Sequence, residues 1–167
     1  MSIADNFSEN IKSLIKKIKI LSIFLIFIIF TLDRYSKLKI INSFSENIFY
    51  INDFINFDLI WNTGIGFGLL SFNSPLIYNL ISILIGLILI LLFYISFKAD
   101  KYEKIIFSII IGGALGNYYD RLFINAVPDF IDLHYGNIHW FTFNVADIFI
   151  TLGIMAFLLK GILIKNN

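Results

Sequence analysis

Long runs of apolar residues alternate with short polar segments along the chain, and four runs approach the length of a membrane span. An α-helix needs about 20 apolar residues to cross ~30 Å of hydrocarbon. The candidate spans cover residues 18–32, 75–97, 105–120 and 141–164. The pattern therefore predicts an α-helical integral membrane protein with four transmembrane helices.

The longest segment between the predicted spans, residues 40–72, has a different pattern. Its stretch FYINDFINFDLIWN alternates aromatic and β-branched residues with polar ones, which is typical of short β-strands. The run NTGIGFG then supplies closely spaced glycines for a tight turn. We expect a small β-structured segment on the outer membrane interface, with Trp61 at headgroup depth. The chain has no internal repeat or low-complexity linker, so residues 1–167 are predicted to form a single domain.

Basic and acidic residues are distributed unequally between the predicted loops. Nine of the 13 Lys and Arg residues fall before the first span, in the 98–104 loop, or near the C-terminal end. Because cytoplasmic loops carry the excess of Lys and Arg, both termini and this loop are predicted to be cytoplasmic. Eight of the 12 carboxylates lie in the other loops or at the adjoining helix ends. The unusual polar residues are therefore predicted to gather at the extracytoplasmic face.

The composition excludes several classes of protein. Hydrophobic residues make up 58% of the chain and charged residues 15%, against about 45–50% and 25% in soluble domains. These proportions exclude a water-soluble globular domain. A net charge of +1 argues against binding to nucleic acid, which favours a strongly basic surface. The absence of cysteine excludes disulfides, thiolate metal sites and a cysteine nucleophile.

Asp147 lies a few residues into the fourth predicted span, in the stretch FTFNVADIFITLG. An ionised, unpaired carboxylate at membrane depth costs several kcal/mol. Asn144 and Thr151, three residues before and four residues after it, share its helix face. The alternative is a polar contact between helices, but Asn, Ser and Thr make such contacts at lower cost. We therefore interpret Asp147 as a functional residue.

Asp129 and Asp132 follow the third predicted span in AVPDFIDLH. In an extended chain, residues three apart point to opposite faces, so only one is expected to face a site. A solvated loop acid is an equally good interpretation of either residue. If one of them meets Asp147, the proximity of like charges raises one pKa, and the pair shares a proton as in aspartic proteases. Such a site needs no metal and no cofactor.

The end of the third predicted span, GGALGNYYDRL, combines small and polar residues. Gly112 and Gly116 form a small-xxx-small pair that allows close approach of another helix, so we assign them to packing. Asn117, Asp120 and Arg121 share one helix face. Arg121 is expected to act as a charge partner for the acids and to anchor a loop. An ionised Asp120 next to it is better suited to a structural role than to proton transfer.

Two further motifs are open to a functional or a structural interpretation. Ser36 and Lys37 in LDRYSK suggest a serine–lysine hydrolase, but adjacent helical residues do not face each other. A lysine that snorkels to the interface is the better prediction there. Asn62 in NTGIGFG either contacts a peptide backbone or makes a turn.

His134 and His139, together with Asp132, could in principle bind zinc. Their spacing is not the i,i+4 pair of a helical site, and loop histidines near an interface are usually only polar. We therefore predict no metal site.

Taken in their order along the chain, these motifs resemble those of the bacterial lipoprotein signal peptidases, also called type II signal peptidases. The matching pieces are LDRYSK at 32–37, NTGIGFG at 62–68, GGALGNYYDR at 112–121, VPDFID at 127–132 and FNVADIFITLG at 143–153. The resemblance implies an aspartic endopeptidase whose catalytic dyad is Asp129 and Asp147. The predicted supporting residues are Asp33, Lys37, Asn62, Gly64, Asn117, Asp120, Arg121 and Asn144. The chain departs from the family pattern outside the dyad, with Arg34 where Gln is usual and Gly66 where Ala is common.

The resemblance also implies a substrate and a cellular location. The substrate would be a prolipoprotein whose cysteine carries diacylglycerol, cut just before that cysteine at the outer face of the bacterial cytoplasmic (inner) membrane. Membrane lipid and a globomycin-like cyclic peptide inhibitor are the other expected partners. No cofactor is expected, and the chain is expected to act as a monomer.

Two other classes of function remain as alternatives. A small ion or solute transporter would use intramembrane carboxylates, but it predicts polar residues through the full depth of the bilayer. The second span reads LISILIGLILILLFYI and offers almost none. A structural membrane-assembly subunit would use the glycines as helix contacts and would tolerate replacement of the acids.

Overall fold

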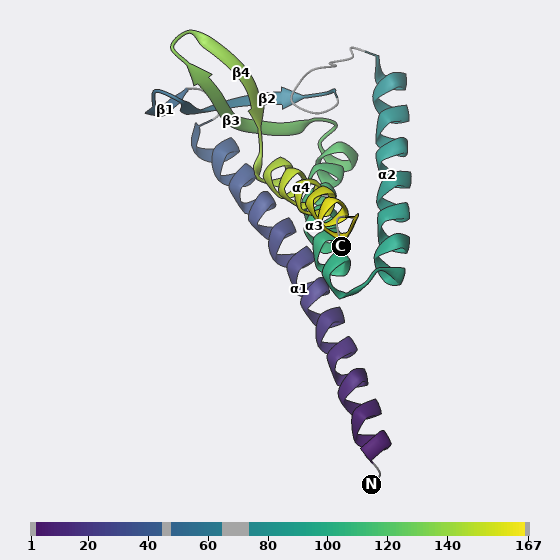
Figure 1. Cartoon of the computed structure of the whole chain (residues 1–167). Coiled ribbons are helices and arrows are strands. Elements are labelled where there is room, and N and C mark those ends of the chain that lie inside the picture. The colour runs from purple at the N-terminus through teal and green to yellow at the C-terminus, as the bar shows by residue number, and fades with distance from the viewer. Residues whose placement is uncertain (1–2, 45–47, 65–73, 166–167) are drawn as a thin grey trace.

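The computed structural model describes residues 3–44, 48–64 and 74–165. Four helices and a four-stranded sheet make up this part of the chain. In Figure 1 the sheet lies across one end of the helices, where α1 ends and α2 begins. The elements in chain order are α1 (Ile3–Phe44), β1 (Phe49–Asn52), β2 (Ile55–Asn62), α2 (Pro75–Lys98), α3 (Lys101–Phe123), β3 (Val127–Tyr135), β4 (Ile138–Phe143) and α4 (Val145–Lys165).

Helices α2 and α3 begin and end where local sequence signals occur. Pro75 occupies the start of α2, where its missing N–H costs nothing. Lys98 lies in the last turn of α2, where a cation is favourable next to the helix dipole. Asp100 caps α3, since its carboxylate accepts the N–H groups of Tyr102 and Glu103 at 2.8 and 2.9 Å. The two helices are therefore joined by a very short connection.

The predicted spans agree with the helices to different degrees. Helix α2 matches the predicted span 75–97 to within one residue, whereas α1 and α3 extend beyond the predicted spans 18–32 and 105–120 at both ends. The predicted start of the last span is wrong, because residues 141–143 belong to β4 and α4 begins at Val145.

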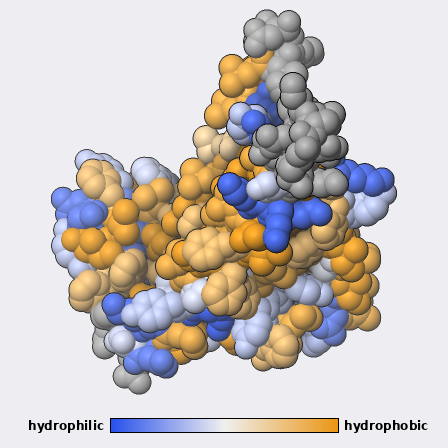
Figure 2. All heavy atoms as spheres, turned by 90° about the horizontal axis from the view of Figure 1, so that it is seen from below, coloured by the Kyte–Doolittle hydropathy of each residue, from blue (hydrophilic) through white to orange (hydrophobic). Residues whose placement is uncertain are grey.

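Two helices in the described residues, Pro75–Lys98 and Val145–Leu163, are long and apolar enough to cross a membrane. Most of their side chains face outwards rather than into the protein. Seen from below, the molecule presents mainly apolar residues at its surface, with polar residues in scattered groups (Figure 2). These features are those of a helical membrane protein, and the count of four spans stays a prediction.

The sheet is antiparallel throughout, with the strand order β1-β2-β3-β4. Strands β1 and β2 lie within the predicted β segment 40–72, but residues 40–44 of that segment are helical. Its residues 65–72, which include Gly66 and Gly68, lie outside the described part of the chain. The prediction included neither β3 nor β4, although it treated the stretch with Asp129 and Asp132 as extended chain, with a solvated loop as the alternative. Most residues of β3 are buried, so this strand lacks the alternation that identified β2.

Helix α3 packs closely against both α1 and α4 through its glycines. A Cβ atom at Gly112 would lie 3.0 Å from Ile29 Cβ, and one at Gly116 would collide with the Asp33 carboxylate. A Cβ at Gly113 would lie 2.6 Å from the Ala146 carbonyl oxygen in α4. The small residues therefore serve helix packing, as predicted. They bring the polar ends of three helices together under the sheet.

Candidate active site

A buried ionic cluster joins α1 to α3. Lys37 Nζ donates to Asp33 Oδ2 at 2.7 Å, Asn117 Oδ1 at 2.8 Å and Asp120 Oδ2 at 2.8 Å. All three of its ammonium hydrogens are thus used, which a fully buried lysine requires. Arg34 forms a second ion pair with Asp120. Two carboxylates and two cations balance each other in this cluster.

The same cluster reaches α4 through the second oxygen of Asp33. Asp33 Oδ1 accepts the backbone N–H of Ala146 at 2.9 Å, which is one of the free donors in the first turn of α4. Side chains of α1 and α3 are thereby tied to the helix start that carries Asp147. The cluster therefore holds the three helix ends in register.

Two predictions about these residues need correction. Lys37 does not snorkel to the interface, since its side chain has no exposed surface. Asp120 is paired with Lys37 and Arg34 rather than with Arg121. Within the described residues, no carboxylate lies within ion-pair distance of Arg121. The structural role predicted for Asp120 agrees with its two cationic partners.

Arg121 holds the chain after β2. Its Nη2 donates to the Gly64 carbonyl at 2.5 Å, and its guanidinium lies 5.7 Å from the ring centre of Tyr78 in α2. Asn62 Oδ1 accepts the Gly64 N–H at 2.8 Å, so the Gly64 peptide is fixed from both sides. The predicted anchoring of a loop by Arg121 therefore agrees with its contacts. Asn62 makes the turn that was one of its two predicted roles.

Asp129 lies in β3 and is almost completely buried, with 2% of its surface exposed. Its two oxygens accept side-chain N–H groups from Asn62 at 2.8 Å and from Asn144 at 2.5 Å. Burial, followed by the charge of Asp147, raises the pKa of the Asp129 carboxyl from 3.8 to about 7, against the opposing effect of these hydrogen bonds. Asp129 therefore changes its protonation state near neutral pH.

Asp147 lies in the first turn of α4 and is held by two asparagines. Asn117 donates its side-chain N–H to Asp147 Oδ1 at 2.8 Å. Asn144 donates its backbone N–H to Asp147 Oδ2 at 3.2 Å, and its side-chain oxygen accepts the Asp147 N–H at 3.1 Å. This reciprocal pair is a capping box, which fixes the start of α4 and the direction of the carboxylate together.

Asn144 connects the two acids directly. Its side-chain N–H bonds to Asp129, and its backbone N–H bonds to Asp147. A strand acid and a helix acid, 18 positions apart in the sequence, therefore flank one asparagine. With one carboxyl protonated and the other ionised, such a pair can remove a proton from water and donate one to a carbonyl oxygen.

Comparison with known proteins identifies the family. The family described as signal peptidase (SPase) II matches residues 25–163. The lipoprotein signal peptidase of Pelagibacter ubique (strain HTCC1062) is 46% identical over 151 residues, covering 88% of this chain and 90% of that protein. That of Anaplasma marginale (strain Florida) is 40% identical over 145 residues, covering 85% and 84%. The chain belongs to the signal peptidase II family.

Solved structures support the same assignment. A bacterial membrane enzyme determined by the in meso method at 2.3 Å resolution superposes with a TM-score of 0.71 at 27% identity. The match covers 87% of this chain and 88% of that one. A second bacterial membrane enzyme structure, at 1.9 Å resolution, gives a TM-score of 0.69 at 26% identity. As a member of the signal peptidase II family, the chain is a protease that acts in lipoprotein processing, and the transporter alternative is not supported.

A groove runs beside Asp147 at the start of α4. Its volume is about 290 Å³, and its residues are Phe141, Phe143, Asp147, Ile148, Thr151 and Leu152. Asp147 is the only charged residue among them, so an apolar segment bound here would lie against the carboxylate. Thr151 lines this groove, which agrees with its predicted position on the Asp147 face.

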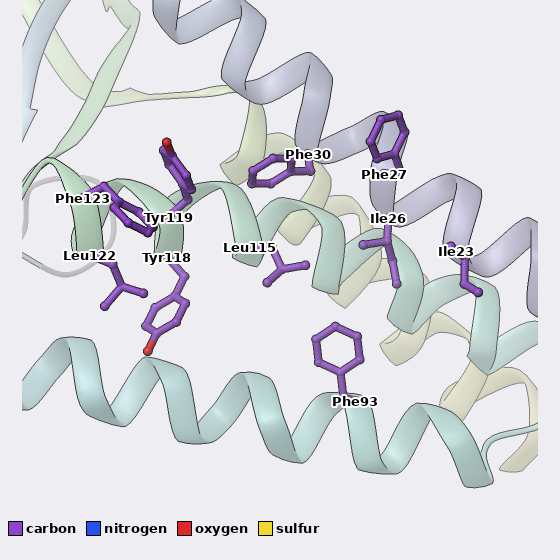
Figure 3. Close-up of a pocket in the computed structure, with 10 residues that line it drawn as sticks. All are labelled: Ile23, Ile26, Phe27, Phe30, Phe93, Leu115, Tyr118, Tyr119, Leu122 and Phe123. Carbon is purple, nitrogen blue, oxygen red and sulfur yellow. The ribbon is translucent and has the colours of Figure 1, made fainter.

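A larger groove lies away from the acids, between α1, α2 and α3. It has a volume of about 570 Å³ and is lined almost entirely by apolar side chains. Figure 3 shows Leu115 and Tyr118 of α3 facing Phe93 of α2 across it. Among the described residues no carboxylate lines this groove, and its apolar surface suits a hydrocarbon chain.

Sequence reasoning missed the partners that orient the acids. Arg34 was treated only as a departure from the family pattern, although it pairs with Asp120. The N-x-x-D spacing from Asn144 to Asp147 is a capping signal and could have located the start of α4. No local signal could have identified the contact of Asp33 with the Ala146 N–H.

Proposed function

We propose that the chain is an aspartic endopeptidase that removes signal peptides from diacylglyceryl-modified prolipoproteins, with Asp129 and Asp147 as its catalytic pair. The observation that carries the proposal is the shared hydrogen bonding of both acids to Asn144. We call this acid pair, together with the buried ionic cluster of α1 and α3, the polar centre. Its other acids, Asp33 and Asp120, are neutralised by Lys37 and Arg34. Within the described part of the chain, Asp129 and Asp147 receive only amide N–H groups, which leaves them able to exchange protons with a bound water.

The proposed reaction needs one proton on the pair. The ionised carboxylate takes a proton from water, and the water oxygen attacks the carbonyl carbon of the scissile bond. The protonated carboxyl donates its proton to the carbonyl oxygen, which gives a neutral tetrahedral intermediate. The intermediate then collapses: the amine nitrogen takes a proton from one carboxyl, the C–N bond breaks, and a hydroxyl of the intermediate gives its proton to the other carboxylate, which restores the singly protonated pair. The Asp129 pKa of about 7 supports a singly protonated pair near neutral pH.

The asparagines act in this scheme as positioning residues. The side-chain amide nitrogens of Asn62 and Asn144 each donate a hydrogen bond to Asp129. Asn117 donates in the same way to Asp147. They therefore stabilise the carboxylates and fix their direction, which lowers the cost of ordering the pair during the reaction.

The proposed substrate suits the two grooves. The groove beside Asp147 is apolar and accepts the hydrophobic end of a signal peptide or the lipid on the cysteine. The larger groove between α1, α2 and α3 accepts an acyl chain of the diacylglyceryl group or of a membrane lipid. A globomycin-like cyclic peptide would inhibit by occupying the position of the peptide next to the acids. The chain works as a monomer in this scheme, since both acids come from one copy.

The proposed topology is four spans with both termini in the cytoplasm and the sheet on the extracytoplasmic side of the bacterial inner membrane. Lys160 of α4 pairs with Asp100 and Glu103 beside the α2–α3 connection, at the opposite end of the helices from the sheet. That end carries most of the basic residues, which favours a cytoplasmic location. The acids then lie at the outer leaflet, the depth at which the lipid of the substrate would hold the scissile bond.

Cleavage of a diacylated prolipoprotein by the purified protein in detergent tests the proposed pair. Asp129→Asn and Asp147→Asn should each lower the rate on the order of 10²–10⁴-fold, the usual contribution of an acid–base group. Asp53→Asn, a matched change of an exposed acid in the β1–β2 turn, should cleave at the normal rate. Unfolding curves of all three variants check that the fold is kept. Near-normal cleavage by a folded Asp129→Asn or Asp147→Asn protein would refute the assignment.

A further inference from the structure

A second polar cluster lies in the sheet, apart from the proposed catalytic pair. Asp132 and His134 lie two residues apart in β3, and His139 of β4 is the register partner of His134. One carboxylate oxygen and one ring nitrogen from each histidine lie within 4.8 Å of one another. Asp132 and His134 are buried, whereas over half of the His139 side chain is exposed. Asn62 and Asn144, which hydrogen-bond to Asp129, take no part in this cluster.

The two ring nitrogens lie close to a single carboxylate oxygen. His139 Nδ1 lies 2.8 Å and His134 Nδ1 lies 3.3 Å from Asp132 Oδ2. Two ligands at 2.0–2.1 Å from a tetrahedral zinc ion are about 3.3 Å apart. The His134 distance therefore already matches one edge of a zinc coordination sphere. The exposed ring of His139 needs to move by only a few tenths of an ångström to match a second.

The hydrogen bonding of His134 indicates what kind of group fits between its Nδ1 and the Asp132 carboxylate. Asn56 of β2 pairs with Asp132 across the sheet, and its amide nitrogen lies 3.4 Å from His134 Nε2. Asn56 Oδ1 and His134 Nδ1 are both buried, and within the described residues neither has a hydrogen-bond partner. Rotating the Asn56 amide by 180° lets its oxygen accept the Nε2–H of His134, which satisfies the oxygen and assigns the tautomer.

This tautomer leaves a lone pair on His134 Nδ1, which faces the Asp132 oxygen at 3.3 Å. Two acceptors at that distance repel each other unless a cation lies between them. An imidazolium would instead donate its Nδ1–H to Asp132, but His134 Nδ1 makes no such hydrogen bond in the described structure. A metal ion resolves the unsatisfied groups, and Asn56 then supports the ligating histidine in the way that metal sites commonly require.

We infer that Asp132, His134 and His139 form a binding site for Zn²⁺ or a similar divalent transition metal ion. Two imidazoles and one carboxylate suit zinc, and water completes the coordination on the exposed side of His139. The sequence-based prediction of no metal rested on helical spacing, whereas the strand register brings the three residues together. The ion ties β3 to β4 beyond Asp129 and has a structural role, so the site does not depend on the proposed catalytic pair.

Metal titration of the full chain in detergent tests this site without reference to cleavage. After treatment with a chelator, the protein should bind one Zn²⁺ per chain, and its unfolding midpoint should rise with added Zn²⁺. Co²⁺ in the same site should give the visible absorption of a tetrahedral ion. His139→Gln changes an exposed side chain and should keep the fold while weakening binding on the order of 100-fold. Asp132→Asn should weaken binding similarly.

Two control variants make the result decisive. Asp53→Asn removes an acid from the same sheet, and Asp147→Asn removes one from the proposed catalytic pair, and both should bind Zn²⁺ like the unmodified chain. The proposal is overturned if no stoichiometric binding occurs. It is equally overturned if His139→Gln and Asp132→Asn bind normally, or if Asp147→Asn abolishes binding, which would locate the ion at the acid pair.

Discussion

Individual side chains in the polar centre have distinct electrostatic roles. Lys37 and Arg34 keep Asp120 paired with cations, and Lys37 also neutralises Asp33. Asp129 is held by neutral amides, and burial, followed by the charge of Asp147, raises its pKa to about 7 against the effect of these hydrogen bonds. The same residue type is thus part of an ion pair in one place and is held by neutral amides in another.

In the proposed mechanism, the pKa of Asp129 sets the alkaline limit of cleavage. Above pH 7 Asp129 no longer carries the proton that this mechanism delivers to the carbonyl oxygen, so kcat/KM should fall as the pH rises through about 7. Asn62→Ala removes a hydrogen bond that favours the ionised form, so the pKa rises and the fall moves to higher pH by about one unit. The pH profiles of both proteins measure this shift.

A second asparagine of the same sheet provides the control for this shift. Asn52 accepts only the backbone N–H groups of Phe54 and Ile55 in the β1–β2 turn, so Asn52→Ala should leave the pH profile where it was. A profile of Asn62→Ala that shifts to lower pH, or does not shift, would show that Asp129 does not control this limb.

The residues of the polar centre could be predicted from the sequence better than their partners. The motifs selected Asp33, Lys37, Asn117 and Asp120, which form one buried cluster together with Arg34. The burial of Lys37 could not be predicted, because it depends on acids that lie 4 and 83 positions away in the sequence. Only the packing of α1 on α3 supplies enough partners to satisfy a lysine without water.

At the level of elements, α3 is the helix on which the others are placed. Its Gly112 and Gly116 contact α1, and Gly113 contacts α4. These close approaches put Asn117 within hydrogen-bond distance of Lys37 on one side and Asp147 on the other. The arrangement of the acids therefore depends on the absence of side chains at these α3 glycines as much as on the acids themselves.

Gly116→Ala tests this dependence. The added methyl group would collide with the Asp33 carboxylate, so α1 must move or Asp33 must leave Lys37 and the start of α4. We expect a loss of about 1–3 kcal/mol of unfolding free energy, typical of an overpacked interior, measured by thermal unfolding in detergent. Gly161→Ala in α4, where nothing lies within 4 Å, should be neutral or slightly stabilising. Equal effects of the two substitutions would rule out the close-contact explanation.

The helices and the sheet differed in how far their sequences predicted them. Helix α2 was placed almost correctly because its apolar run is bounded by Pro75 and Lys98. Strand β3 was missed because it lies between β2 and β4 and is buried along most of its length. The sequence therefore identified Asp129 as a candidate catalytic residue but did not place it in a strand of the sheet. The sheet register that places Asp129 against Ile60 arises from pairing between distant segments.

At the scale of the whole molecule, charge and position divide the protein into two ends. One end carries the sheet and the acids, and the other carries the α2–α3 connection with Lys160 paired to Asp100 and Glu103. Helix α2 (Pro75–Lys98) runs between the two ends with a largely exposed apolar surface, and Val145–Leu163 of α4 is similarly apolar. A membrane around α2 and α4 would therefore leave the two ends on opposite sides.

Thiol labelling of the intact membrane determines which end faces outwards, because the chain contains no cysteine of its own. Asp53→Cys places a thiol in the exposed β1–β2 turn, and Lys101→Cys places one at the exposed start of α3. A membrane-impermeant reagent applied to spheroplasts should label the first variant and not the second, and both should react after permeabilisation. This result follows if the basic end is cytoplasmic. Labelling of Lys101→Cys alone would reverse the topology and place the acids on the cytoplasmic side, where they could not meet a lipid-anchored substrate at the outer leaflet.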